Sequence, residues 1–175
     1  MNLFLLSQIL VGMAIVTDFL AFQCKNRQKI LLFLSISCAL IATHYFLLSK
    51  NTAGILIIIS LIKYLVAKYS PLTRNMILLL LIETVAFYLT FEVLSDFIML
   101  SASVSFTFGA FQKNDKYLRL LMMAAAISII TYDILIWSPV AIVLECLYFT
   151  SNAIGYCKFY WRKNLAMPKA STTKK

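Results

Sequence analysis

Long apolar runs, separated by short polar clusters, make up most of this chain. A helix needs about 20 apolar residues to cross about 30 Å of hydrocarbon, and most of the runs reach this length. The third and fourth runs are shorter, and few polar residues separate the fourth from the fifth. The pattern predicts an all-α polytopic membrane protein with seven transmembrane helices, at residues 3–22, 30–48, 53–67, 76–91, 94–111, 118–136 and 139–159.

Composition supports a membrane protein and excludes a soluble one. Of the 175 residues, 62% are hydrophobic and 13% are charged, and the mean hydropathy is +0.87. Soluble domains are about 45–50% apolar and about 25% charged, so this chain has too little polar surface to cover a water-soluble body. We therefore expect one transmembrane domain at residues 1–161 and a short tail at 162–175.

The placement of basic residues predicts the orientation of the helices. Short cytoplasmic loops collect Lys and Arg. If all seven runs cross the membrane, Lys50 stands alone on one side and Lys63 lies inside a run, whereas the other 14 basic residues share the opposite side. This asymmetry predicts an N-terminus outside and a C-terminus in the cytoplasm. The 14 residues are Lys25, Arg27, Lys29, Lys68, Arg74, Lys113, Lys116, Arg119, Lys158, Arg162, Lys163, Lys169, Lys174 and Lys175.

The tail at 162–175 contains five basic residues and no acidic ones. A segment of this composition does not fold alone and is attracted to the anionic lipids of the inner leaflet. We therefore expect a disordered basic arm that meets anionic lipids. The net charge of +9 is distributed as membrane topology requires, so it does not indicate a nucleic-acid partner.

The two halves of the chain are similar at an offset of about 88 residues. The sequence FQCKN at 22–26 leaves the first run and FQKN at 111–114 leaves the fifth, while IATH at 41–44 corresponds to IITY at 129–132. One connecting helix between two three-helix repeats gives both repeats the same orientation. The prediction is a 3+1+3 arrangement of parallel repeats, at about 3–69 and 94–161, joined by a helix at about 75–91.

Parallel repeats imply a pseudo-two-fold axis along the membrane normal. One class of small transporters has this arrangement, with the substrate path between the halves. The chain also resembles the YgjV-type bacterial inner-membrane proteins, in the wider group that contains the SWEET and PQ-loop carriers. The residues that carry the resemblance are the two FQ exits, THYFLL at 43–48, and the correspondence of Lys63-Tyr64 with Ser151-Asn152. It covers roughly residues 7–161 and implies this architecture, a location in the bacterial inner membrane and a homo-oligomer.

Two departures from the SWEET pattern limit what this resemblance implies. SWEET carriers have prolines within their helices, whereas Pro71, Pro139 and Pro168 lie in loops, at a helix start or in the tail. Those carriers also hold substrate with an asparagine pair. Asn152 corresponds to one member, but Tyr64 stands in the place of the other. Neither proline-hinged gating nor a sugar site is carried over.

Ionisable residues inside apolar runs are costly in lipid and usually face a protein interior or a water-filled cavity. Asp18 and Lys63 each lie four residues before the predicted cytoplasmic end of a run. Their shared depth predicts an ion pair that closes an inner gate. The alternative is that the Lys63 side chain extends to the interface and that Asp18 is solvated there.

A second group of ionisable residues lies toward the outer face. His44, Asp133 and Glu145 share a band of depth, and a histidine beside a carboxylate can couple proton movement to transport. The alternative for His44 is a structural hydrogen bond. Glu83 lies in the middle of the connecting helix, where it is either protonated or bonded to a neighbouring helix.

Four uncharged polar residues make the best candidate for a site near the middle of the membrane. They are Asn152 and Ser151 in the second half, level with Ser60 and Tyr64 in the first. The sequence lacks HExxH and GxSxG motifs and contains one histidine, and its four cysteines have no metal-ligand spacing. We therefore predict no enzymatic activity, no metal and no cofactor.

The sequence as a whole predicts an integral membrane protein that carries a small polar solute between its halves. The alternative is a membrane protein without transport activity, with a structural, assembly or sensing role. In that case its buried charges would serve the fold.

Overall fold

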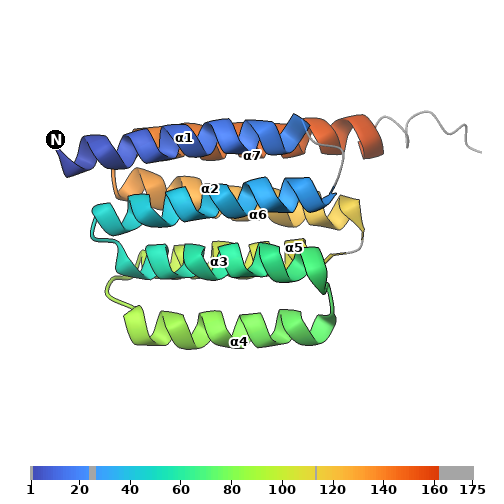
Figure 1. The fold of residues 1–175 in the computed structure, drawn as a ribbon, viewed down its shortest axis with the longest axis horizontal. Coiled ribbons are helices and arrows are strands. Elements are labelled where there is room, and N and C mark those ends of the chain that lie inside the picture. The colour runs from blue at the N-terminus through green and yellow to red at the C-terminus, as the bar shows by residue number, and fades with distance from the viewer. Residues whose placement is uncertain (1, 24–26, 113, 162–175) are drawn as a thin grey trace, which may run out of the picture.

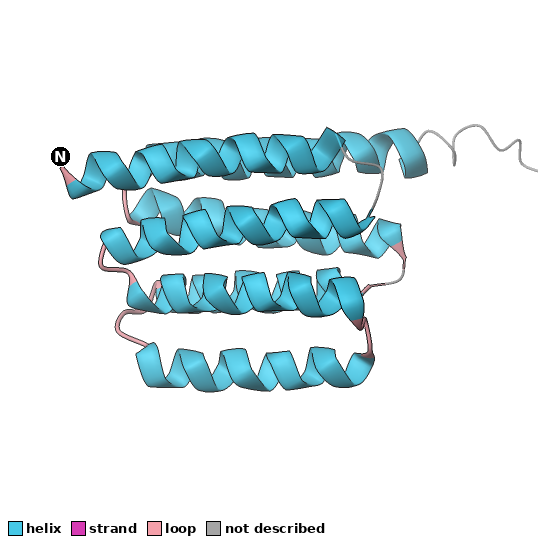
Figure 2. Ribbon diagram, in the orientation of Figure 1, coloured by secondary structure: helices cyan, strands magenta, loops and turns pink. Residues whose placement is uncertain are grey.

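The structure is a computed structural model that describes residues 2–23, 27–112 and 114–161. Every regular element in these ranges is a helix (Figure 2). The predicted basic tail and the residues Lys25 and Lys113 of the repeat exits lie outside the described residues. The helices are α1 (Leu3–Gln23), α2 (Arg27–Leu47), α3 (Asn51–Tyr69), α4 (Thr73–Thr90), α5 (Asp96–Phe111), α6 (Asp115–Leu135), α7 (Pro139–Tyr156) and a π-helical extension of α7, η1 (Cys157–Trp161).

Each predicted apolar run corresponds to one of the α-helices. Within the described residues, four of these helices are long and apolar enough to cross a membrane, namely α1, α3, α4 and α6. The third run was predicted to begin at Ala53 and the fourth at Met76, but α3 begins at Asn51 and α4 at Thr73. The polar side chains of these first turns find partners in neighbouring turns: the Thr52 hydroxyl donates to the Thr90 carbonyl, and the Asn75 amide donates to the Ser70 carbonyl at 2.9 Å.

The helices form two layers of three, with α4 along one edge (Figure 1). In one layer α2 lies between α1 and α3, and in the other α6 lies between α7 and α5. The layers meet where α1 packs against α7 and where α3 packs against α5. Helix α4 lies against both α3 and α5, so it covers one of these two edges.

Consecutive helices run in opposite directions, which places the turns at two ends of the molecule (Figure 1). The turns after α2, α4 and α6 lie at the same end as the N-terminus. Lys50, Glu92 and Asp96 belong to this end, whereas Lys68 and Lys158 belong to the other. Basic residues therefore predominate among the described charges at the end away from the N-terminus.

Two turns at the N-terminal end have the same backbone conformation. Ser49 follows α2 with φ 58° and Trp137 follows α6 with φ 56°, a left-handed conformation that is uncommon without glycine. In each turn an amide reaches back five residues, from Lys50 to the Tyr45 carbonyl at 2.9 Å and from Ser138 to the Asp133 carbonyl at 3.0 Å. This bond is the helix-ending pattern that satisfies late carbonyl groups.

Small and aromatic side chains fill the space between the layers. Ala53, Ala102, Ala125 and Ala126 are fully buried, so the helix backbones approach closely. Large apolar side chains such as Leu81 instead lie exposed on the outside. An apolar exterior around a close-packed interior is the surface expected of a protein that faces lipid.

Candidate functional site

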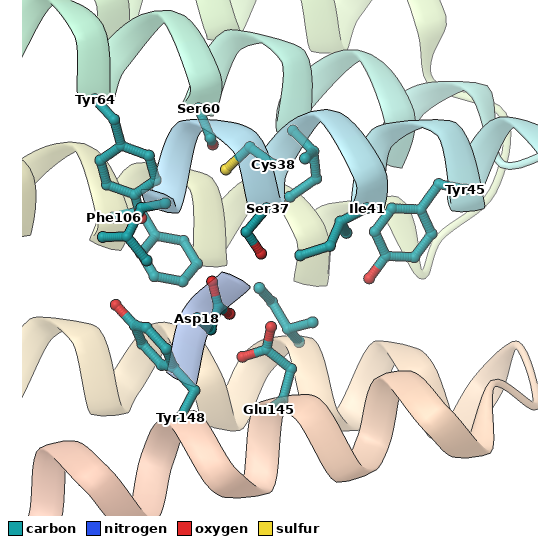
Figure 3. Close-up of a pocket in the computed structure, with 13 residues that line it drawn as sticks. Asp18, Ser37, Cys38, Ile41, Tyr45, Ser60, Tyr64, Phe106, Glu145 and Tyr148 are labelled. Atoms are coloured by element: carbon teal, nitrogen blue, oxygen red, sulfur yellow. The ribbon is translucent and has the colours of Figure 1, made fainter. Parts of the chain in front are cut away.

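A small cavity lies between the two layers and is lined by both. We call it the central cavity; its volume is about 40 Å³, enough for a few water molecules. Figure 3 shows the side chains that surround it. They are Asp18 from α1, Leu34, Ser37, Cys38, Ile41 and Tyr45 from α2, Ile57, Ser60 and Tyr64 from α3, Phe106 from α5, Ile129 from α6, and Glu145 and Tyr148 from α7.

Helical periodicity explains why these side chains meet. Residues three or four apart lie on one face of a helix, and the lining residues follow this spacing. On α3 the intervals run from Ile57 to Ser60 and Tyr64, and on α7 from Glu145 to Tyr148. Each of these helices therefore presents one face to the cavity.

The lining residues also reproduce the offset found in the sequence. Four pairs of lining residues are separated by 88 positions, the offset of the predicted repeat. The two members of each pair differ in chemistry except for the isoleucines. The pairs are Asp18 with Phe106, Ile41 with Ile129, Ile57 with Glu145, and Ser60 with Tyr148.

Two carboxyl groups enter the central cavity from opposite layers without a full set of partners. Oδ1 of Asp18 and Oε2 of Glu145 have no hydrogen-bond partner among the described residues, and neither does the Ser37 hydroxyl. Both carboxyl groups point toward the same space (Figure 3). A buried polar group without a partner is costly, so this cavity is suited to hold water or a ligand with hydrogen-bond donors.

Lys63 does not pair with Asp18, so the predicted inner gate is wrong. Its Nζ lies 2.7 Å from Oε2 of Glu83 on α4 and also donates to the Ser103 carbonyl at 2.9 Å. Shared depth in the membrane does not decide which way a side chain points. Tyr64 faces the central cavity, but Lys63, one residue earlier, faces α4 and α5.

Glu83 is bonded to neighbouring helices, which was one of its two predicted alternatives. Its Oε2 accepts from the Ser103 hydroxyl at 2.5 Å, and its Oε1 accepts from the Thr107 hydroxyl at 2.8 Å. Glu83 and Lys63 are 0% and 1% exposed. The network thus attaches α4 to α3 through a buried ion pair, and to α5 through the hydroxyl groups that donate to the Glu83 carboxylate.

His44 forms the structural hydrogen bonds of its alternative interpretation. Its Nδ1 lies 3.1 Å from the Ser7 carbonyl oxygen and its Nε2 lies 3.1 Å from the Ser138 hydroxyl. Asp133 instead accepts a hydrogen bond from Tyr45 at 2.9 Å, and Glu145 lines the central cavity. The three ionisable residues of the predicted outer cluster therefore have three separate environments.

The four uncharged candidates also separate into different environments. Ser60 and Tyr64 line the central cavity. Asn152 is buried, and its amide donates to the Tyr148 carbonyl of its own helix at 3.0 Å. Ser151 lies on a hollow between α1 and α7. The structure therefore brings together two of these four residues.

That hollow is a second, larger space, which we call the lateral groove. Its volume is about 380 Å³. Asp18 and Tyr148 line both the groove and the central cavity, so the two spaces are neighbours. The groove is lined by Ile15, Asp18 and Phe19 of α1 and by Leu144, Leu147, Tyr148, Thr150, Ser151 and Ile154 of α7.

Comparison with known proteins identifies the family. A family model described as bacterial inner membrane protein matches residues 5–163, nearly the whole chain. The chain belongs to the YgjV family. Searches of curated proteins and of solved structures gave no match. Membership of this family, together with apolar helices long enough to cross a bilayer, makes the protein an integral membrane protein of the bacterial inner membrane.

In this YgjV-family protein, sequence reasoning missed several residues of the central cavity. Tyr148 is one of them, although two signals point to it: it stands 88 positions after Ser60 and three residues after Glu145 on the same helix face. Tyr45 and Ser37 were missed because single polar residues in apolar runs are common. Among the described residues, no group of three His, Cys, Asp or Glu side chains could hold a metal ion.

Proposed function

We propose that this YgjV-family protein is a SWEET-like carrier that moves a small polar solute between its two layers of helices. One observation carries the proposal: a cavity between the layers, lined by corresponding positions of both halves, contains two carboxyl groups with unpartnered oxygens. In a bilayer, ionisable groups that face an internal cavity are typical of substrate and ion pathways.

The architecture proposed for this carrier is two parallel repeats, α1–α3 and α5–α7, joined by α4. The order of packing supports it, since α1 meets α7 and α3 meets α5, as a two-fold rotation along the helices requires. The matching turns at Ser49 and Trp137 support it as well. In transporters of this kind the substrate path follows the axis between repeats.

All seven α-helices cross the inner membrane in this proposal, with the N-terminus outside and the C-terminus in the cytoplasm. The concentration of described basic residues at the end away from the N-terminus supports this orientation. The same rule places the basic tail, residues 162–175, near anionic lipids. We propose no nucleic-acid partner for this protein. The expected assembly is a homo-oligomer.

Solute chemistry follows from the lining of the central cavity. Carboxyl oxygens of Asp18 and Glu145 accept hydrogen bonds, so the solute must offer hydroxyl or amine donors. The rings of Tyr64, Phe106 and Tyr148 provide flat apolar surfaces beside them. Because the cavity holds only about 40 Å³, the layers must separate before a solute enters.

A hydrogen bond between the layers opposes their separation. The hydroxyl of Tyr45 on α2 donates to Asp133 on α6 at 2.9 Å, and the Tyr45 ring packs against Tyr132 with centroids 5.9 Å apart. Opening toward the N-terminal end breaks this contact. Tyr45 and Asp133 therefore act as a closing contact, in place of the inner gate predicted for Asp18 and Lys63.

The test is uptake of a pooled set of isotopically labelled metabolites into proteoliposomes, with and without a proton gradient. We expect flux through the wild type and little through Glu145→Gln, which removes a cavity carboxylate while preserving size. Glu92→Gln is the matched control, because Glu92 is exposed outside the cavity, and it should retain flux. Folded protein without flux for any solute would contradict the proposal.

The second candidate is a protein without transport activity, with a structural, assembly or sensing role. The satisfied networks around Glu83 and His44 favour it, because buried polar groups with complete partners stabilise a fold. Absence of flux in the same experiment would select this role. Neither candidate is an enzyme or uses a cofactor, since the sequence lacks the motifs for both.

A further inference from the structure

The two edges where the layers meet are related but unequally covered. At the edge between α3 and α5, helix α4 inserts Glu83 among Lys63, Ser103 and Thr107. In the predicted repeat, Lys63 corresponds to Ser151, Ser103 to Ile15 and Thr107 to Phe19, each 88 positions away. All three corresponding residues line the lateral groove. The groove between α1 and α7 is therefore the counterpart of the site that α4 occupies.

The charge at the two edges is reversed. The edge under α4 supplies a cation, Lys63, and the helix that covers it brings the carboxylate of Glu83. In the groove the lysine is replaced by Ser151, and the ionisable group is the carboxyl of Asp18, whose Oδ1 has no hydrogen-bond partner among the described residues. A complementary occupant must therefore bring a cation, where α4 brings an anion.

Most of the remaining groove lining is apolar, and the groove is open to the bilayer. Phe19 and Ile154 on its walls are 61% and 62% exposed, and Leu144 and Leu147 line it between them. Its volume of about 380 Å³ lies in the range of ligand pockets, about 300–1,000 Å³. An alkyl chain fits this lining, while a purely polar solute does not.

We propose that the lateral groove binds an amphiphilic amine, with its ammonium group at Asp18 and its alkyl chain along α1 and α7. The cation in the interior of this chain's own described helices, Lys63, is buried and paired with Glu83, so it does not supply the ammonium group. The amine enters sideways from the bilayer, and because Asp18 lines both spaces, an amine in the groove and a solute in the central cavity compete for its carboxyl group.

The test is equilibrium binding of tritiated dodecylamine to the full-length protein in nanodiscs of zwitterionic lipid, with empty nanodiscs subtracted. We expect saturable binding to the wild type. A charge-assisted hydrogen bond contributes about 1.5–3 kcal/mol, so Asp18→Asn should weaken binding about tenfold or more. Dodecanol, which has the same chain and no charge, should bind the wild type more weakly by a similar factor.

Two further variants locate the binding site. Ser151→Phe fills the groove and leaves Asp18 in place, so it should remove dodecylamine and dodecanol binding alike. Glu92→Gln changes an exposed carboxylate and should bind as the wild type does. Thermal unfolding of each variant establishes that it is folded, and if Asp18→Asn does not fold, Ser151→Phe provides the test.

Three results would overturn the proposal. The first is the absence of saturable dodecylamine binding to folded wild type. The second is unchanged binding in folded Ser151→Phe or Asp18→Asn. The third is binding that is lost in Glu145→Gln and kept in Asp18→Asn, which would place the amine in the central cavity.

Discussion

Two buried glutamates in this fold have opposite surroundings. Glu83 is 0% exposed and accepts from Lys63, Ser103 and Thr107. Glu145 is 7% exposed and its Oε2 has no partner among the described residues. Burial alone therefore does not separate a structural carboxylate from a functional one. The number of hydrogen-bond partners separates the two kinds of carboxylate. A carboxylate with a full set of partners stabilises the fold, whereas one without partners can still bind water or a ligand.

The position of each glutamate agrees with this contrast. Glu83 lies on α4, outside the two three-helix layers, and attaches that helix to them. Glu145 lies between the layers, 88 positions from Ile57 on the opposite wall of the same cavity. A carrier has to rearrange contacts between its layers, whereas the Glu83 network joins α3, α4 and α5 and so holds the two layers together at one edge.

Removing the partner of the satisfied glutamate should have the largest effect. Lys63→Met leaves the Glu83 carboxylate buried and uncompensated, and we expect a loss of about 3–5 kcal/mol in the free energy of unfolding. Denaturant unfolding in mixed micelles measures it. The double variant Lys63→Met with Glu83→Leu should regain most of the loss, because no charge then stays buried. A single variant as stable as the wild type would show that the network does not hold α4.

Loss of the His44 ring should have the next largest effect. His44→Phe leaves the Ser7 carbonyl and the Ser138 hydroxyl without their imidazole partner, and an unsatisfied buried group costs about 1–3 kcal/mol. We expect the variant to unfold at a lower temperature and to retain whatever flux the wild type has. A proton-coupled flux that disappears in folded His44→Phe would instead assign His44 to the transport path.

The contact between the layers should have a smaller effect. Tyr45→Phe removes one hydrogen bond to Asp133, and such bonds between membrane helices average about 0.6 kcal/mol. Combining it with Asp133→Asn should cost less than the sum of the two single losses, because both remove the same bond. Strict additivity in a double-mutant cycle would show that the bond does not contribute to closure.

The unsatisfied glutamate should matter least for stability. Oε2 of Glu145 has no hydrogen-bond partner among the described residues, so Glu145→Gln should change the free energy of unfolding by less than about 0.5 kcal/mol. The same unfolding assay compares it directly with Lys63→Met. A loss as large as that of Lys63→Met would place Glu145 in the structural class and remove the basis of the proposed solute path.

Much of the fold could be predicted from the sequence, while the partners of its buried charges could not. The apolar runs predicted each of the described α-helices, because the cost of exposing a peptide backbone to lipid requires long helices. From the sequence, the partners of buried charges could be inferred only from their depth in the membrane. That criterion predicted a pair between Asp18 and Lys63. The structure instead places Asp18 beside the cavity that Glu145 lines, and Lys63 against Glu83.

The sequence by itself determined that this protein is helical and belongs in a membrane, because hydrophobic periodicity is a property of the chain, and its offset of 88 predicts two similar halves. Only the tertiary structure decided which face of each helix meets which neighbour. Adjacent residues on a helix point about 100° apart. Lys63 therefore stabilises α4 while Tyr64, the next residue, lines the cavity between the layers.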